Sequence, residues 1–192
     1  SKIPITSKSL LAQYELGFKW KQDREAGKWQ RTDSVIDKQV PQVLFIEACL
    51  RLLKLGGRMA IVLPEGVFGN PTDRYIFQYI FQEAKVLSVV SCPHETFQPS
   101  THTKTSILFL EKTPSNENYN IFMAIAEKAG HDKNGKVIYK IDEKGDYVLD
   151  EAGRRIIDDD LPIIADRYEQ FRQNGSRSGK YSHLGFTLEY AN

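Results

Sequence analysis

The sequence predicts an α/β fold: a strand–helix–strand unit, then an antiparallel strand, then a small extension of hairpins and one helix. Residues 58–64 lack polar alternation after Arg58, which is typical of a strand buried on both faces. A helical pattern at 72–84 separates this run from a second apolar run at 85–92, so the two strands should run parallel with a right-handed connection. A third run, at 103–112, follows without an intervening helix and should run antiparallel to its neighbour.

The residues before this unit contain the strongest helix signal of the chain. Residues 40–55 repeat apolar side chains at three- and four-residue steps, a proline suits the first turn, and two glycines follow the end. Residues 7–19 predict a shorter helix with Ser7 as its N-cap. The polar residues 20–38 between them predict a loop.

The remainder of the chain changes character. Residues 119–130 fit a strand, a helix or both. Turn dipeptides then predict a hairpin array: Asn134-Gly135, Lys144-Gly145 and Ala152-Gly153. Residues 158–173 predict a helix with an Asp cap and a proline in its first turn, and the tail is linker-like. We therefore expect a first domain at 1–113, a hairpin-and-helix extension at 114–174, and a linker at 175–192 that leads toward a further region.

Composition is that of an ordinary soluble protein, with 41% hydrophobic and 27% charged residues. No apolar run reaches membrane-helix length and the first residues lack a signal-peptide core, so we expect a cytoplasmic protein without membrane contact. Charge is uneven, because residues 1–31 carry seven Lys/Arg against three Asp/Glu, and residues 141–171 carry ten Asp/Glu against four Lys/Arg. Solvated surfaces explain both runs. The alternative is a basic face toward an anionic polymer and an acidic face turned away from it.

Motifs that would reveal chemistry by themselves are absent from the sequence. No Gly-rich loop is placed to cradle a phosphate, and nothing resembles a nucleophile elbow. The histidines show no metal-ligand spacing and lie in predicted loops: His94, His102, His131 and His183. We therefore expect exposed histidines and no metal.

Two longer stretches carry a family resemblance. QVLFIEACLRLLKLGGRMAIVLPEGVF at 42–68, followed by ETFQPSTHTKTSILFLEK at 95–112, resembles the C-terminal half of the adenine-N6 DNA methyltransferase domain of type I restriction–modification modification subunits and their fused relatives. Residues 121–140 together with 158–171 resemble the segment that follows this domain in one branch of the family. The joint pattern is more specific than GGRMAIVLP alone, which many methyltransferases share in similar form.

The resemblance implies the C-terminal half of a Rossmann-like methyltransferase sheet, whose last strand is an antiparallel hairpin partner. In that family, earlier strands hold S-adenosylmethionine, and an Asn-Pro-Pro-Phe or Asn-Pro-Pro-Tyr motif receives the flipped adenine. Neither feature occurs in this sequence, and residues 1–9 resemble the stretch just after that motif. We therefore expect no catalytic or cofactor-binding residue within this chain, and no activity from it alone.

The candidate site residues come from the same resemblance. Phe97 occupies the position of an aromatic residue that stacks on the flipped base. Pro64 and Glu65 would lie in the pocket wall, at the strand end where open α/β sheets place their ligands. Two hydroxyls and one charge suit DNA backbone phosphates: Thr101, Lys104 and Thr105. The alternatives are a Phe97 packed into the hairpin core, a loop shaped only by packing, and a solvated Lys104.

The expected function is part of a DNA methyltransferase that moves a methyl group from S-adenosylmethionine to adenine N6 in a restriction–modification system. The expected partners are DNA, a specificity subunit or fused target-recognition domain, and a restriction subunit. The alternative is a non-enzymatic interaction module, in which the hairpin array and the following helix bind a partner subunit. An Asn-Pro-Pro motif encoded directly upstream of Ser1 would favour the enzyme.

Overall fold

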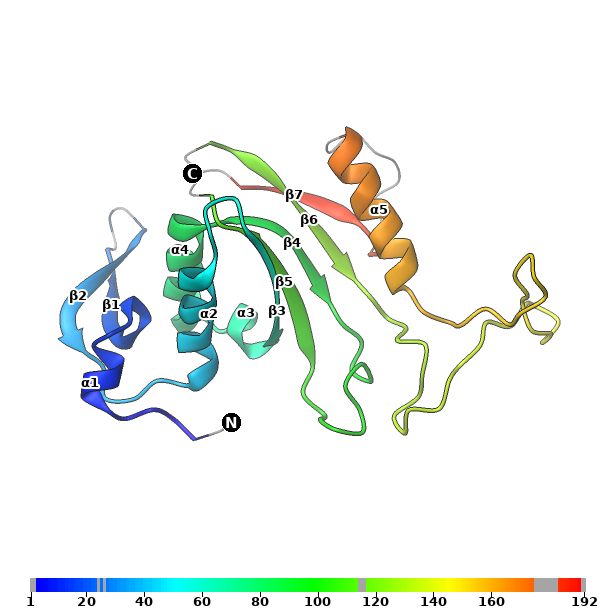
Figure 1. Ribbon diagram of the computed structural model, residues 1–192, viewed down its shortest axis with the longest axis horizontal. Coiled ribbons are helices and arrows are strands. Elements are labelled where there is room, and N and C mark those ends of the chain that lie inside the picture. The colour runs from blue at the N-terminus through cyan, green and yellow to red at the C-terminus, as the bar shows by residue number, and fades with distance from the viewer. Residues whose placement is uncertain (1–2, 24, 26, 114–116, 175–182, 191–192) are drawn as a thin grey trace. The chain divides into compact units, whose positions relative to one another are not determined.

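The computed structural model describes residues 3–23, 25, 27–113, 117–174 and 183–190. It contains a two-stranded sheet, β1-β2, and a five-stranded sheet in the order β3-β5-β4-β6-β7 (Figure 1). The chain divides into two compact units, one built mainly from residues 1–87 and 109–117 and the other from 88–108 and 118–191. This division differs from the expected boundaries at 113 and 174, which stay a prediction.

The first unit begins with a helix that is shorter than predicted. Ser7 caps α1 (Lys8–Leu11) as expected, because its hydroxyl accepts a hydrogen bond from the backbone N–H of Leu10. The predicted helix over 7–19 is otherwise wrong. A short 3-10 turn, η1 (Glu15–Gly17), folds back so closely that a Cβ on Gly17 would lie 2.0 Å from the carbonyl oxygen of Leu11. Only glycine permits this approach.

The predicted loop at 20–38 is also wrong, because it contains most of a β-hairpin. β1 (Phe18–Gln22) pairs antiparallel with β2 (Trp29–Val35). The side chains of Trp20 and Trp29 pack against Tyr75, with ring centroids 6.0 and 6.1 Å away. These strands are so polar that apolar and polar residues do not alternate along them. They pack instead on Tyr75, which lies far away in the sequence.

The predicted helix and strand that follow are confirmed. α2 (Pro41–Leu52) has its proline in the first turn, and the chain turns at Gly56 with φ +74° before β3 (Arg58–Pro64). α2 also holds the preceding segment, since the buried carboxylate of Glu47 accepts 2.8 Å hydrogen bonds from the backbone N–H groups of Glu15 and Leu16. The proline thus favours the start of α2, and the hydrogen bonds to Glu47 independently tie the middle of the helix to the segment before it.

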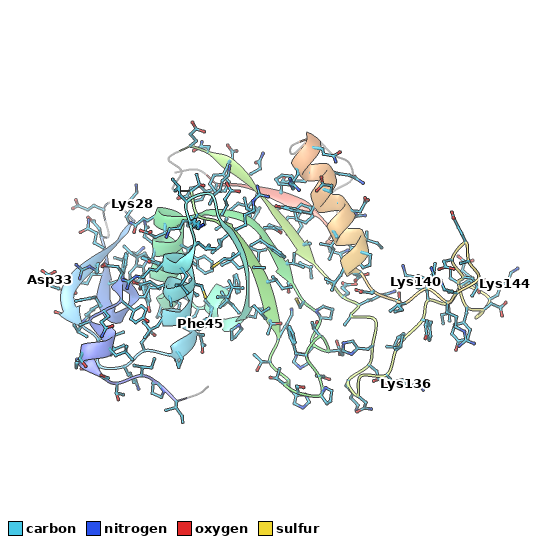
Figure 2. The ribbon with its side chains drawn as sticks, viewed as in Figure 1. Lys28, Asp33, Phe45, Lys136, Lys140 and Lys144 are labelled. Atoms are coloured by element: carbon cyan, nitrogen blue, oxygen red, sulfur yellow. The ribbon has the colours of Figure 1, made fainter. Side chains whose placement is uncertain are left out.

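β3 is not buried on both faces as predicted: its exposure alternates along the strand, so one face is uncovered, and the strand also lies at one end of the strand order. Val62 is 47% exposed and Ala60 is exposed as well. Beside the strand, a groove of about 610 Å³ separates it from α2, whose Phe45 is 63% exposed (Figure 2). The groove is lined almost entirely by apolar side chains of α2 and β3.

The strand directions agree with the predicted unit. α3 (Gly66–Gly69), η2 (Pro71–Asp73) and α4 (Arg74–Glu83) connect β3 to β4 (Lys85–Ser91). β5 (Thr105–Glu111) starts where β4 ends, because the backbone N–H of Cys92 donates to the carbonyl of Thr105 at 3.0 Å. It ends where β3 starts, because Lys112 exchanges 2.8 Å backbone hydrogen bonds with Gly56 and Gly57. β5 is therefore antiparallel to both strands, and β3 and β4 run parallel to each other.

The second unit extends the sheet. Residues 119–130, left open between strand and helix, contain β6 (Tyr119–Ile125), which pairs parallel with β4. Within the expected linker at 175–192, residues 186–190 form β7 (Phe186–Tyr190), which pairs antiparallel with β6. The linker interpretation is therefore wrong for these five residues.

α5 (Leu161–Asn174) confirms the predicted helix and lies against β6. The Phe122 ring contacts the rings of Tyr168 and Phe171 at centroid distances of 5.4 and 5.7 Å. The Asp cap is present, because the carboxylate of Asp159 accepts a hydrogen bond from the backbone N–H of Leu161.

Between β6 and α5 lies the predicted hairpin array, the yellow segment of Figure 1. We call residues 131–157 the three-turn array. In each turn an Asp carboxylate accepts two backbone N–H groups, and a glycine with φ between +75° and +89° closes the turn. The three carboxylates belong to Asp132, Asp142 and Asp150. These turns confirm the glycine signals.

Candidate functional site

The loop between β4 and β5 carries most of the predicted site residues. Residues 93–104 form a series of tight turns, closed by backbone hydrogen bonds from Thr96 to Pro93 and from Gln98 to Glu95. The hydroxyl of Thr96 also donates to the carbonyl of Pro93 at 2.8 Å. The loop is therefore held by its own hydrogen bonds at the carboxyl end of β4.

Phe97 lies at the centre of this loop. Its carbonyl accepts a 3.0 Å hydrogen bond from the backbone N–H of Thr101, which fixes the backbone on either side of the ring. The side chain is 38% exposed. An aromatic ring that is partly exposed on an ordered loop can offer a face to a planar ligand, whereas a fully buried core residue cannot.

The three predicted phosphate contacts lie in different surroundings. Thr101 is exposed, and its hydroxyl interacts with Thr103 through the side chain and the backbone N–H, both at 3.2 Å. Lys104 is exposed at the end of the loop. Thr105 is only 7% exposed, because it is the first residue of β5 opposite Cys92, and its buried hydroxyl has no hydrogen-bond partner among the described residues. A phosphate contact by Thr105 would require an exposure that this structure does not show.

A cavity of about 470 Å³ adjoins the loop on the side of Glu95. Its ionisable side chains are four carboxylates, two lysines and one histidine: Glu95, Glu127, Asp132, Asp158, Lys128, Lys133 and His131. Because carboxylates predominate, this cavity disfavours a phosphate and suits groups that donate hydrogen bonds. The sequence did not indicate it, since its wall combines residues that lie up to 63 positions apart.

Hydrogen bonds organise one wall of this cavity. Lys128 forms an ion pair with Asp158 at 3.0 Å, and the hydrogen bond to Asp158 raises the pKa of the lysine. The buried carboxylate of Asp160 accepts 2.9 Å hydrogen bonds from the backbone N–H groups of Glu127 and Lys128. These contacts fix the chain where β6 ends and α5 begins.

Pro64 and Glu65 belong to the first unit and are described separately from the loop. Both are partly buried at the carboxyl end of β3. The carbonyl of Glu65 accepts backbone hydrogen bonds from Phe68 and Gly69 at 3.0 and 3.2 Å, which starts α3 directly after the strand. The sequence Pro-Glu-Gly therefore ends β3 and redirects the chain within one turn.

The groove beside β3 is poorly suited to a nucleoside cofactor. The groove beside β3 is lined mainly by apolar residues, with Gln42 as its polar side chain, and so lacks the acceptors that ribose hydroxyls require. Within the described ranges, no group of three or more His, Cys, Asp or Glu side chains could hold a metal ion. Among the same residues, no helix has both the length and the apolar character to cross a membrane.

Comparison with known proteins places this architecture in a family. The model of the N-6 DNA methylase family matches residues 10–184. The methylase subunit of the type I restriction enzyme EcoEI from Escherichia coli is 36% identical over 70 residues, which are 36% of this chain and 14% of that protein.

Solved structures of type I systems are also similar to this chain, and the first of the following two shows the same fold. A structure of an assembling type I restriction–modification system is 18% identical, with a TM-score of 0.52 over 82% of this chain and 30% of that chain. The methyltransferase subunit of the type I system of Streptococcus thermophilus is 16% identical, with a TM-score of 0.48 over 91% of this chain and 32% of that chain. This chain thus spans about a third or less of these relatives. Because the family model covers most of its residues, the chain belongs to the N-6 DNA methylase family.

Proposed function

We propose that this chain is part of an adenine-N6 DNA methyltransferase of a restriction–modification system, to which it contributes contacts with the target base and the DNA backbone. The match of the family model over residues 10–184 carries this proposal. The partly exposed Phe97, on an ordered loop at the carboxyl end of β4, gives it a specific residue. The complete protein would act in the cytoplasm, with DNA and the other subunits of such a system as its partners.

Phe97 would stack on the flipped adenine. A base that leaves the duplex loses its stacking neighbours, which costs a few kcal/mol, and an aromatic face in the pocket recovers part of that energy. The turn hydrogen bonds of the loop fix the backbone of Phe97 before a base arrives, so less conformational entropy is lost on binding.

The flanking residues would position the DNA. Thr101 and Lys104 are exposed on the same loop and would contact phosphates through a hydroxyl and a charge, which do not distinguish bases. Thr105 would join them only if the start of β5 opens. Pro64 and Glu65 would form pocket wall at the end of β3.

The methyl group would come from S-adenosylmethionine. The family resemblance assigns that cofactor to earlier strands, so we assign none of the described residues to it. In the complete enzyme, the role of this segment would therefore be to bind and orient the adenine and its strand.

Substitution of Phe97 in the full-length protein tests the proposal. Stacking on an aromatic side chain is worth about 1–3 kcal/mol per base, so Phe97→Ala should slow adenine methylation roughly ten- to hundredfold without weakening S-adenosylmethionine binding. Phe97→Trp should retain most of the rate, because it keeps an aromatic face.

Phe97→Leu is the matched control, since leucine keeps apolar volume but has no ring face. We expect this variant to fold like the parent and to lose methylation almost as alanine does. Methylation at the parental rate by the leucine variant would mean that Phe97 serves only packing. Methylation is measured on a duplex that contains the target adenine, and cofactor binding by calorimetry.

A further inference from the structure

The three-turn array closes on itself through a cycle of backbone hydrogen bonds. The N–H of Lys140 donates to the carbonyl of Ile156 at 2.8 Å, and the N–H of Ile156 donates to the carbonyl of Val148 at 3.0 Å. The N–H of Val148 then donates to the carbonyl of Lys140 at 3.0 Å, which completes the cycle. Three short chain segments are thereby held around one centre.

This cycle places six side chains on one face. Three antiparallel bridges pair Tyr139 with Ile157, Ile141 with Tyr147, and Leu149 with Arg155. Neighbouring bridges use residues two positions apart on one segment: 139 and 141, 147 and 149, and 155 and 157. Side chains two positions apart in extended chain point to the same side. The six residues therefore form a closed ring, which we call the array face: Tyr139, Ile141, Tyr147, Leu149, Arg155 and Ile157.

Contacts across the ring support this arrangement. The guanidinium of Arg155 lies 4.0 Å from the ring centroid of Tyr147 and 5.7 Å from that of Tyr139, and the two tyrosine rings meet edge to face at 6.0 Å. Ile141 and Leu149 are 64% and 53% exposed. The array face is thus an ordered cluster of apolar and aromatic side chains that faces solvent.

The charges of the array are arranged around this face. Arg155 has no carboxylate partner among the described residues, whereas its neighbour Arg154 is paired with Asp150 at 2.8 Å. The two turns that adjoin the face, at 142–146 and 150–154, carry five carboxylates against one lysine and one arginine. The array face therefore has an unpaired cation within an apolar ring and an acidic rim.

The array lysines do not change this pattern. Lys140 lies between Tyr139 and Ile141 and so points to the opposite side, and Lys136 belongs to the first turn of the array, at 132–136 (Figure 2). The acidic rim repels DNA phosphates, and an apolar ring offers them nothing. Exposed Tyr and Arg side chains in an apolar cluster are instead typical of the energetic centre of protein–protein interfaces.

We propose that the array face docks a protein partner whose surface presents an Asp or Glu carboxylate within an apolar patch, with Lys or Arg residues around it. The carboxylate pairs with Arg155, the apolar side chains cover Ile141 and Leu149, and the basic residues meet the acidic rim. This interaction does not depend on adenine methylation, and it accounts for an extension that the catalytic proposal does not use.

Photo-crosslinking in the native host tests the proposal on the full-length protein. Benzoylphenylalanine at Leu149 should crosslink to one protein, and mass spectrometry should find the crosslinked peptide to contain Asp or Glu beside apolar residues. The same amino acid at Ala152, on a turn tip, is the position control. Crosslinks to DNA, or none above the Ala152 level, would overturn the proposal.

Two neighbouring arginines give a matched comparison. Arg155→Ala should reduce the Leu149 crosslink at least tenfold, whereas Arg154→Ala should leave it within about twofold, because Arg154 already has an internal partner. Equal losses in the two variants would contradict a docking role for Arg155. Limited trypsin cleavage at Lys140 reports whether each variant keeps the array folded.

Charge reversal distinguishes a direct pair from a folding effect. Arg155→Glu should abolish the crosslink, and a change of the identified partner carboxylate to arginine should restore it. If Arg155→Ala unfolds the array, Leu149→Lys replaces it, with the photo-crosslinking amino acid moved to Ile141. Leu149→Lys leaves the stack of Arg155 on the tyrosines intact and should still reduce crosslinking. Crosslinking of this variant at the parental level would reject the array face as the docking surface.

Discussion

Glu47 and Asp150 make similar sets of hydrogen bonds in opposite surroundings. Each carboxylate accepts two backbone N–H groups at 2.8–2.9 Å, and each pairs with an arginine four residues later in the chain. Glu47 is fully buried on α2, whereas Asp150 lies on an exposed turn of the array.

The two pKa values nevertheless move in opposite directions. Burial raises the pKa of Glu47, against the effect of both N–H groups and of Arg51. The hydrogen bond from the backbone N–H of Arg154 lowers the pKa of Asp150, because on this turn its effect exceeds the opposing effect of desolvation. Solvent access, and not the number of hydrogen bonds, decides the direction of the shift.

The largest effect should come from removal of the buried carboxylate. Glu47→Ala leaves the N–H groups of Glu15 and Leu16 without their acceptor and removes the partner of Arg51, so the free energy of unfolding should fall by about 3 kcal/mol. Urea unfolding followed by circular dichroism measures the loss.

Glu15→Ala is the control for this prediction. The Glu15 side chain pairs with Arg31 at 2.7 Å but is exposed, and such pairs contribute less than about 1 kcal/mol. Similar losses in the two variants would mean that burial adds nothing to the role of Glu47.

A smaller and local effect should follow from removal of the exposed carboxylate. Asp150→Ala should open the turn at 150–154 while the global unfolding midpoint stays unchanged, because that turn contributes little to the core. Asp150→Asn should keep the turn, since its carbonyl can accept the same two N–H groups. Hydrogen exchange at the Arg154 amide distinguishes the variants, and an alanine variant with parental protection would contradict the assigned role.

The parts that could be predicted from the sequence are those fixed by local chemistry. A proline and two glycines mark α2, and glycines mark the turns of the array. Apolar runs locate β3, β4 and β5, and the absence of a helix between the last two gives their relative direction. In the site, Phe97 came from the family resemblance, with a packed core residue as the alternative; the structure shows the side chain 38% exposed, and its stacking role stays a prediction.

The remaining features depend on partners distant in sequence. The hairpin β1-β2 rests on Tyr75, and β7 is a strand because it pairs with β6 more than 60 residues earlier. Thr105 is buried because β4 lies beside it, and the array face exists only because residues 139 and 157 meet. No local pattern reports such pairings.

Acidification should have opposite effects at Glu47 and Asp150. We expect these effects to be smaller than those of the two substitutions above. Burial raises the pKa of Glu47 above its ordinary value of 4.5, so the proton-linked part of its contribution to stability is fully present below that value and is lost as pH rises through the folded-state pKa. The pKa of Asp150 lies below its ordinary value of 3.8, so its contribution is present above that value and is lost as pH falls through the folded-state pKa. As the pH falls below 3.8, the Arg154 amide should therefore lose protection from hydrogen exchange, whereas the Leu16 amide should keep or gain it. Protection factors corrected for the intrinsic exchange rate give the comparison, and a parallel loss at the two amides would show that burial does not set the sign.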